Sequence, residues 1–135
     1  SKDKFKIVAQ QDGGAALDKS MELAEDIITA SPDMDAFFCI NDPSALGAAA
    51  AIKAANKTGK IGVYSIDASP DGKQALLDDE FTAVACQVPV QIADYSFKEA
   101  VKYVNGDTKI DEKKVYLDSQ LVSKDEAEKT LKEWQ

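Results

Sequence analysis

Three short apolar runs in the chain each end in a polar side chain, and this pattern limits the fold more than any other feature. Each run is rich in β-branched or aromatic residues and precedes a segment that can form a helix, which is typical of buried parallel strands in an α/β sheet. The polar residues are Asn41, Asp67 and Gln87. Ligands of open α/β sheets bind outside the carboxyl ends of the strands, which lie along one edge. The sequence therefore predicts that two amides and one carboxylate converge on one small polar molecule.

Length, charge and the lack of histidine narrow the functions open to the chain. Its 135 residues are enough for one domain with a hydrophobic core and too few for two. The 24 acidic residues outnumber the 16 basic ones, and the formal net charge of -8 disfavours nucleic acid and anionic membrane as partners. Histidine is absent, which removes the commonest general base and the commonest metal ligand. These features argue against an enzyme, and we expect neither a metal nor a cofactor.

The two cysteines are expected to be free. Cys39 and Cys86 lie near the ends of two strands that should flank a third. With neighbouring strands about 4.8 Å apart, the two backbones would be about 10 Å apart, which is too far for a disulfide. The chain starts at Ser1 and shows no apolar stretch of a signal peptide, so we expect a processed or trimmed product.

The first two thirds of the chain alternate between strand and helix patterns. Ser69 followed by Pro70 predicts a helix start, because serine caps helices well and proline suits the first helical position. The alanine-rich segment after Asn41 predicts a helix that packs closely on its neighbours. The expected order is a strand at 5–9, a helix ending near 31, a strand ending at 40, a helix ending near 57–59, a strand at 61–66, a helix from 70 to about 79 and a strand at 82–86.

The last third of the chain changes character. A helix is expected from Pro89 to Asn105, followed by a polar connector at 107–114. Residues 115–122 predict a further strand with partial alternation. Ser123 and Glu126 then form the pattern of a capping box at the start of a terminal helix that should reach Trp134.

Each of the three polar residues also has a purely structural interpretation. Asn41 could cap the alanine-rich helix, Asp67 could be a turn aspartate, and Gln87 could be a solvated strand end. The next residue, Asp42, we assign to the helix cap. The loop at 12–14 lacks both the dinucleotide fingerprint and the lysine of a phosphate-binding loop, so we interpret it as a plain turn.

A series of short motifs, with their order and spacing, is specific where each motif alone would be weak. Together they resemble the carboxyl-terminal part of the ribose-type (type 1) periplasmic sugar-binding proteins of bacterial ABC transporters, almost from end to end. The motifs are Ser31-Pro32-Asp33, Ile40-Asn41-Asp42, Ala45-Leu46-Gly47-Ala48, Ile66-Asp67, Pro70-Asp71-Gly72, Ala85-Cys86-Gln87-Val88-Pro89 and Leu121-Val122-Ser123-Lys124-Asp125.

The resemblance implies a doubly wound α/β receptor with two hinged lobes that close on a pentose or hexose and deliver it to a membrane permease. Residues 1–87 would belong to the carboxyl-terminal lobe, residues 88–122 would supply a helix and a strand that complete the amino-terminal lobe, and residues 123–135 would form a terminal helix. The residues that match the family's sugar-binding positions are Asn41, Asp67 and Gln87. The implied location is the periplasm or, with a lipid anchor, the outer face of the bacterial membrane. The effector-binding core of a LacI-type regulator has the same fold and is the alternative, although nothing in this chain binds DNA.

Two departures from the family pattern affect these expectations. Many relatives carry an aromatic residue just after the strand that matches 5–9, whereas residues 11–17 contain none and Ala15 or Ala16 fills the place. The chain also begins at the second strand of the family's 2-1-3-4-5 order, so the central first strand and the amino-terminal lobe would be missing. We hypothesise that the chain is a fragment whose missing piece comes from a second polypeptide, comes from a domain-swapped copy or lies outside this sequence, because exposed apolar faces and unpaired strand edges seek partners.

Overall fold

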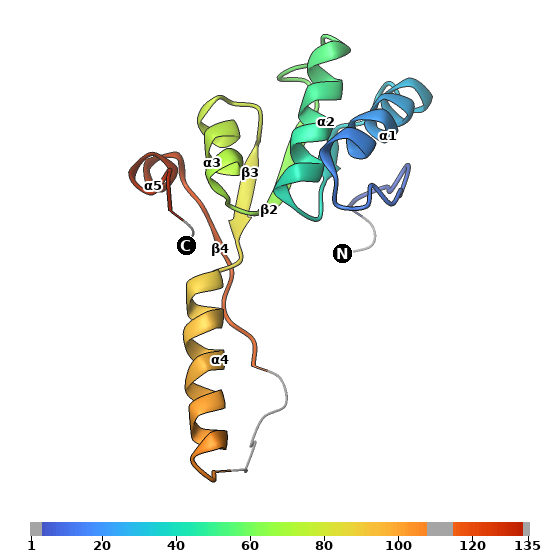
Figure 1. Cartoon of the computed structure of the whole chain (residues 1–135). Coiled ribbons are helices and arrows are strands. Elements are labelled where there is room, and N and C mark those ends of the chain that lie inside the picture. Colours follow the sequence, from blue (N-terminus) through green and yellow to red (C-terminus); the bar gives the residue numbers. More distant parts are fainter. Residues whose placement is uncertain (1–3, 108–114, 134–135) are drawn as a thin grey trace.

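The computed structural model describes residues 4–107 and 115–133, which form an α/β unit with one projecting helix (Figure 1). Most of the predicted elements are present at the expected positions. The element order is α1 (Leu17–Ala30), β1 (Ala36–Phe38), α2 (Asp42–Ala54), β2 (Gly62–Asp67), α3 (Pro70–Leu77), β3 (Ala83–Cys86), α4 (Pro89–Val104), β4 (Gln120–Leu121) and α5 (Lys124–Lys129).

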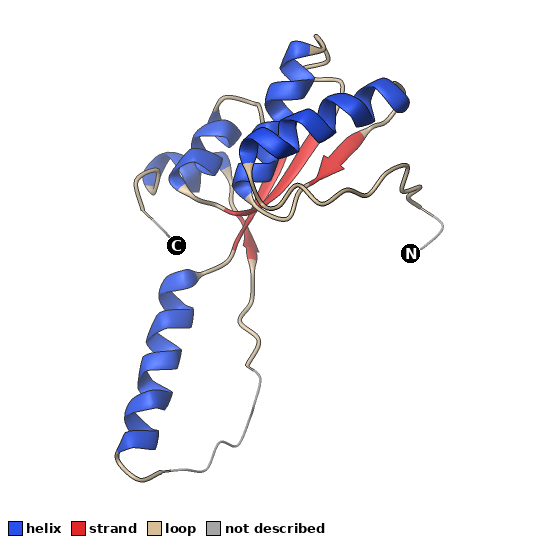
Figure 2. Cartoon of the chain, turned by 45° about the vertical axis from the view of Figure 1, so that its right-hand side comes forward, coloured by secondary structure: helices blue, strands red, loops and turns tan. Residues whose placement is uncertain are grey.

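The strands form one sheet in the order β1-β2-β3-β4. β1, β2 and β3 are parallel, and the short β4 pairs antiparallel with β3. The prediction of three successive parallel strands is therefore confirmed. Because β1, β2 and β3 are parallel, their carboxyl ends lie at a common edge. α1, α2 and α3 all lie on one side of these strands (Figure 2).

The core lies between this helical layer and the covered face of the sheet. Val63 and Val84 are 1% and 0% exposed, and they belong to the same hydrophobic core as the buried alanines of α2. Gly47 sits where α2 meets α1, and a Cβ added there would lie 2.4 Å from the Leu17 carbonyl oxygen. The alanine-rich sequence therefore permits the close helix packing that was expected.

The other face of the sheet has no helical layer among the described residues. Phe38 and Leu121 are 76% and 73% exposed, and Tyr64 is 41% exposed. Their side chains lie on the same side because residues paired across neighbouring strands share a face, as Phe38 and Tyr64 do. An α/β sheet normally buries both faces, so this apolar surface is a large unpartnered one.

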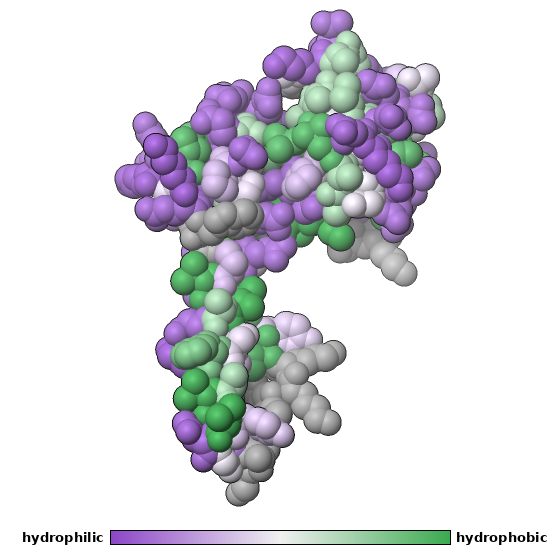
Figure 3. Space-filling view, viewed as in Figure 1, coloured by the Kyte–Doolittle hydropathy of each residue, from purple (hydrophilic) through white to green (hydrophobic). Residues whose placement is uncertain are grey.

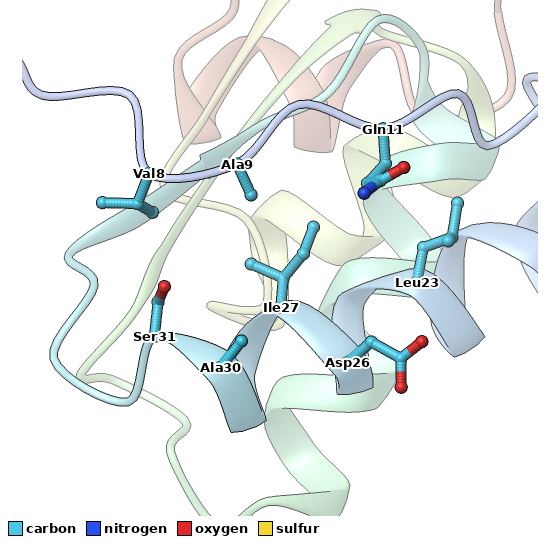
Figure 4. Close-up of a pocket in the computed structure, with 8 residues that line it drawn as sticks. All are labelled: Val8, Ala9, Gln11, Leu23, Asp26, Ile27, Ala30 and Ser31. Carbon is cyan, nitrogen blue, oxygen red and sulfur yellow. The ribbon is translucent and has the colours of Figure 1, made fainter.

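The prediction of a strand at residues 5–9 was wrong. The segment has no regular secondary structure, and Phe5 and Ile7 are 85% and 79% exposed. A strand needs a neighbour to receive its backbone hydrogen bonds, and no strand of the described sheet lies beside this segment. Val8 and Ala9 instead border a shallow groove against Ile27 of α1 (Figure 4).

The strand predicted at 115–122 is much shorter in the structure, where only Gln120–Leu121 pairs with β3. The capping box of Ser123 and Glu126 is confirmed, but α5 ends at Lys129 rather than near Trp134, which lies outside the described residues. The polar connector expected at 107–114 also lies almost wholly outside them. A strand requires hydrogen-bonding partners along its whole length. β4 is short because it pairs only with Ala85 and Cys86, the last two residues of β3.

Helix α4 projects away from the rest of the described chain (Figure 1), and none of its residues is buried. Its exposed surface carries large apolar side chains, as the space-filling view shows for the lower part of the molecule (Figure 3). The most exposed of them are Val90, Phe97, Tyr103 and Val104. An amphipathic helix of this kind is stable in most proteins because its apolar stripe packs against another element.

Both cysteines are free and buried, as predicted. Cys39 follows β1 and Cys86 ends β3, with β2 between them. Burial raises the pKa of the Cys39 thiol to about 11, which keeps it protonated at neutral pH.

Candidate ligand-binding site

The three predicted polar residues lie at the carboxyl edge of the sheet. Asp67 is the last residue of β2, Gln87 directly follows β3, and Asn41 directly precedes α2. Asp67 pairs in register with Cys86, the residue before Gln87. The strand exits therefore bring together the side chains that the sequence pattern had grouped.

Asp67 and Gln87 interact directly. The Gln87 side-chain amide donates from Nε2 to Asp67 Oδ1 over 2.6 Å. Burial raises the pKa of the Asp67 carboxyl, and the N–H of Asp42 opposes this shift by donating to its other oxygen. Gln87 is exposed and its Oε1 accepts no hydrogen bond from the described residues, so this oxygen is available as an acceptor.

Asn41 is the N-cap of α2. Its Oδ1 accepts a hydrogen bond from the Ser44 N–H at 3.1 Å, as a capping residue should. Its Nδ2 donates to the Ala15 carbonyl over a long 3.4 Å. The capping interpretation is thus confirmed, and it leaves the side-chain NH₂ as the group through which Asn41 could also bind a ligand.

Asp42 does not belong to the cap, and the sequence-based assignment was wrong. Its side chain is 1% exposed and points into the protein, where Oδ1 accepts from Ser65 Oγ at 2.6 Å and Oδ2 accepts from the Ser69 backbone N–H at 2.8 Å. The sequence carries a weak signal for this role, because two serines flank Asp67 at positions from which they can reach the start of α2. Only the packing of α2 beside β2 brings the three together.

The turn between β2 and α3 is strained. Asp67 and Ala68 have φ angles of 127° and 57°, which residues other than glycine rarely adopt. Ala68 is fully buried, so a larger side chain has no room there. Ser69 then caps α3 by accepting from the Gly72 N–H at 3.1 Å, which confirms the predicted Ser69-Pro70 helix start.

The site presents both hydrogen-bond donors and hydrogen-bond acceptors. Asn41 presents a donor, Gln87 an acceptor, and Asp67 two acceptor oxygens that each retain a free lone pair after their present bonds. Hydroxyl groups both donate and accept, so a polyhydroxylated ligand matches this set. Among the described residues there is no group of three or more side chains able to hold a metal ion.

The groove between the amino-terminal segment and α1 is a separate feature. Its lining combines apolar side chains with Gln11, Asp26 and Ser31 and includes none of the three site residues (Figure 4). It therefore does not contribute to the candidate site.

The model of the periplasmic binding protein domain matches residues 1–108, a segment that includes all three site residues. The chain belongs to the periplasmic binding protein family. The resemblance inferred from the motifs is thereby confirmed, as is the type 1 fold of the ribose-type sugar-binding proteins. No helix of the described ranges is both long and apolar enough to span a bilayer.

Several relatives of this periplasmic binding protein are named for sugars. It is 34% identical over 104 residues to the ribose import binding protein of Salmonella typhimurium, which covers 77% of this chain and 35% of that protein. It is 32% identical over 109 residues to the D-ribose/D-allose-binding protein of Pseudomonas aeruginosa, covering 81% of this chain and 34% of that one. The chain thus spans about a third of the length of these relatives.

Solved structures agree in fold. A galactofuranose binding protein superposes with a TM-score of 0.84 at 30% identity, covering 93% of this chain and 44% of that one. An ABC transporter periplasmic solute binding protein from Actinobacillus succinogenes with bound D-allose superposes with a TM-score of 0.83 at 25% identity, covering 92% and 43%. Both of these proteins are binding proteins.

Proposed function

We propose that the chain supplies one side of the sugar site in the substrate-binding component of a sugar ABC transporter. The observation that carries this proposal is the hydrogen-bonding set at the sheet edge, in which Asp67 accepts from Gln87 and from the N–H of Asp42, the residue next to the cap residue Asn41. A carboxylate that accepts from ligand hydroxyls forms charge-assisted bonds, which are stronger than neutral ones. The names of the relatives, for ribose and for allose, support a pentose or hexose as the ligand class.

The proposed mechanism involves no chemical conversion. A second lobe would close over the sugar, and the closed form would dock on the permease subunits, because the ligand stabilises the closed state by its additional contacts there. The projecting α4 supports the assignment of this helix to that second lobe, since its apolar side chains have nothing to cover them among the described residues, whereas β4 pairs with β3 in the sheet of the first lobe. A second polypeptide or a swapped copy of this chain would be an alternative source of the lobe.

The proposed location follows from the same relatives and is the periplasm, with or without a lipid anchor. The alternative of a LacI-type regulator would require a helix-turn-helix headpiece in the gene ahead of this segment, whereas a transport receptor would require a secretory signal. Sequencing of the complete gene distinguishes them directly.

The experiment that tests the proposed function is calorimetric titration of the intact gene product with pentoses and hexoses, beginning with D-ribose and D-allose. We expect one sugar to bind, and Asp67→Ala to weaken its binding by about 1–3 kcal/mol, because its hydrogen-bonding partners stay unpaired. Asp33→Ala, which removes an exposed carboxylate between α1 and β1, is the matched control. Equal affinity of Asp67→Ala and wild type would refute the proposed site.

A further inference from the structure

The buried carboxylate of Asp42 lies directly behind the candidate site. It accepts hydrogen bonds from Ser65 Oγ at 2.6 Å, from the Ser69 N–H at 2.8 Å and from Ser69 Oγ at 2.6 Å. Ser65 belongs to β2 and Ser69 caps α3, so one side chain from α2 joins three elements. A buried charge is retained only where such bonds satisfy it.

Asp42 also holds both sides of the strained turn. Its backbone N–H donates to Asp67 Oδ2 at 3.4 Å. Its carboxylate accepts a hydrogen bond from the N–H of Ser69, the residue that follows Ala68. Between these two contacts lie the positive φ angles of Asp67 and Ala68. Residues in such conformations persist only where the surroundings hold them.

We propose that Asp42 is a positioning residue that fixes the Asp67 turn and so aims the Asp67 carboxylate at the ligand. Asp42 contacts Asp67 through its backbone N–H. Its own side chain is buried and therefore does not reach the exposed surface of the candidate site. The inference rests on the proposed sugar site, and it assigns to Asp42 a share of the binding affinity that a helix-capping residue would not have.

Gly72 offers a way to disturb Asp42 without changing any charge. A Cβ added at Gly72 would lie 2.1 Å from Asp42 Oδ2 and 2.4 Å from its Cγ. Gly72 lies within α3 and does not have a positive φ, so alanine suits its backbone. Gly72→Ala should therefore displace the Asp42 carboxylate, whereas Asp42→Asn places an amide NH₂ against the donors of Ser65 or Ser69.

The test measures the affinity of the intact gene product for D-ribose and D-allose by calorimetry. We expect Asp42→Asn and Gly72→Ala each to weaken binding by about tenfold or more, because a misaimed carboxylate loses charge-assisted bonds to the sugar. The control is Asp71→Asn, which removes an exposed carboxylate from the first turn of the same helix and should bind as the wild type does. Far-UV circular dichroism checks that each variant is folded at the temperature of the titration.

A double variant separates positioning from general damage to the fold. If Asp42 acts through Asp67, Asp42→Asn combined with Asp67→Ala binds no more weakly than Asp67→Ala alone. Additive losses in the double variant, or wild-type affinity of both Asp42→Asn and Gly72→Ala, would overturn the inference while leaving the proposed function intact. Wild-type affinity of Asp67→Ala, or a wild-type protein that binds neither these sugars nor any other pentose or hexose, overturns the proposed function and this inference with it.

Discussion

Gln87 and Asp67, from the ends of neighbouring strands, are joined by a hydrogen bond of 2.6 Å between Nε2 and Oδ1. The bond fixes the amide so that its carbonyl oxygen is left for a ligand, and it uses one lone pair of the carboxylate. A site for hydroxyl groups needs such an arrangement because each hydroxyl must find both a donor and an acceptor.

Replacing Gln87 by glutamate should disrupt this pair. Gln87→Glu places a second carboxylate next to Asp67, and two like charges so close together raise the pKa of one of them strongly. We expect the affinity for the sugar to fall by about tenfold at neutral pH and to recover partly as the pH falls, when the pair holds one proton. Calorimetric titration across pH measures this.

Gln91→Glu is the control for that substitution, because Gln91 is exposed in the first turn of α4. It adds the same charge away from Asp67. A loss of affinity as large in Gln91→Glu as in Gln87→Glu would show that net charge, rather than the contact with Asp67, is responsible.

The stability of the protein should depend on pH through Asp67. Burial raises the folded-state pKa of this carboxyl above its ordinary value of 3.8, so its contribution to stability is fully present below that value and is lost as the pH rises through the raised pKa. Asp67→Asn removes the ionisation. The free energy of unfolding of Asp67→Asn relative to the wild type should therefore increase between about pH 3 and pH 7, as measured by urea denaturation.

Glu126 should show the opposite dependence and serves as a comparison. Hydrogen bonds from the Ser123 N–H and hydroxyl lower the pKa of the Glu126 carboxyl. Its contribution to stability is present above the ordinary pKa of 4.5 and is lost as the pH falls through the lowered pKa. Glu126→Gln should thus be destabilising at neutral pH and nearly neutral in strong acid, and parallel pH profiles for the two variants would contradict at least one of the two assignments.

Alanine at position 47 should destabilise the protein although alanine favours helices. A Cβ at Gly47 would lie 2.4 Å from the Leu17 carbonyl oxygen and 2.8 Å from the Met21 nitrogen, both of which are backbone atoms of α1. Overpacking of this kind costs about 1–3 kcal/mol, which exceeds the roughly 1 kcal/mol that alanine gains over glycine in a helix. Urea denaturation of Gly47→Ala measures the difference, and an increase in stability would show that α1 moves aside freely.

Removing the Lys73 ammonium should loosen α5. The Lys73 side chain is fully buried, and its Nζ donates to the backbone carbonyls of Thr130 and Glu133, at distances of 2.8 and 2.7 Å. Lys73→Met keeps most of the volume but removes both hydrogen bonds, including the one donated to the Glu133 carbonyl, at a cost of about 1–3 kcal/mol. Hydrogen exchange of the α5 amides should accelerate accordingly.

Lys53→Met is the matched control for Lys73→Met, since Lys53 is largely exposed and its ion pair with Glu80 is long at 3.4 Å. Exposed pairs contribute at most about 1 kcal/mol. Equal effects of the two substitutions on the exchange of α5 would show that the contacts of Lys73 do not hold that helix.

Local sequence signals predicted much of this fold because their causes are local. The Ser69-Pro70 start of α3 and the capping box of Ser123 and Glu126 each depend on residues within one helical turn, and both are present. The alternation of apolar runs with helical segments likewise placed three parallel strands and their shared carboxyl edge.

Predictions that depended on neighbours distant in sequence were the ones that failed. Residues 5–9 have the composition of a strand, but pairing requires a strand beside them. Asp42 was taken for part of a helix cap because aspartate is common there, yet the hydroxyls of Ser65 and Ser69 hold its side chain. A carboxylate forms whichever hydrogen bonds the fold brings within reach.

The sequence by itself therefore determined the element types, the caps and the edge at which Asn41, Asp67 and Gln87 lie, since periodicity and strand direction encode these. Only the tertiary structure decided which groups meet across elements: the bond between Gln87 and Asp67, the contact of Gly72 with Asp42 and the burial of Lys73 under α5. Such contacts depend on distances between segments far apart in the chain, and packing sets those distances.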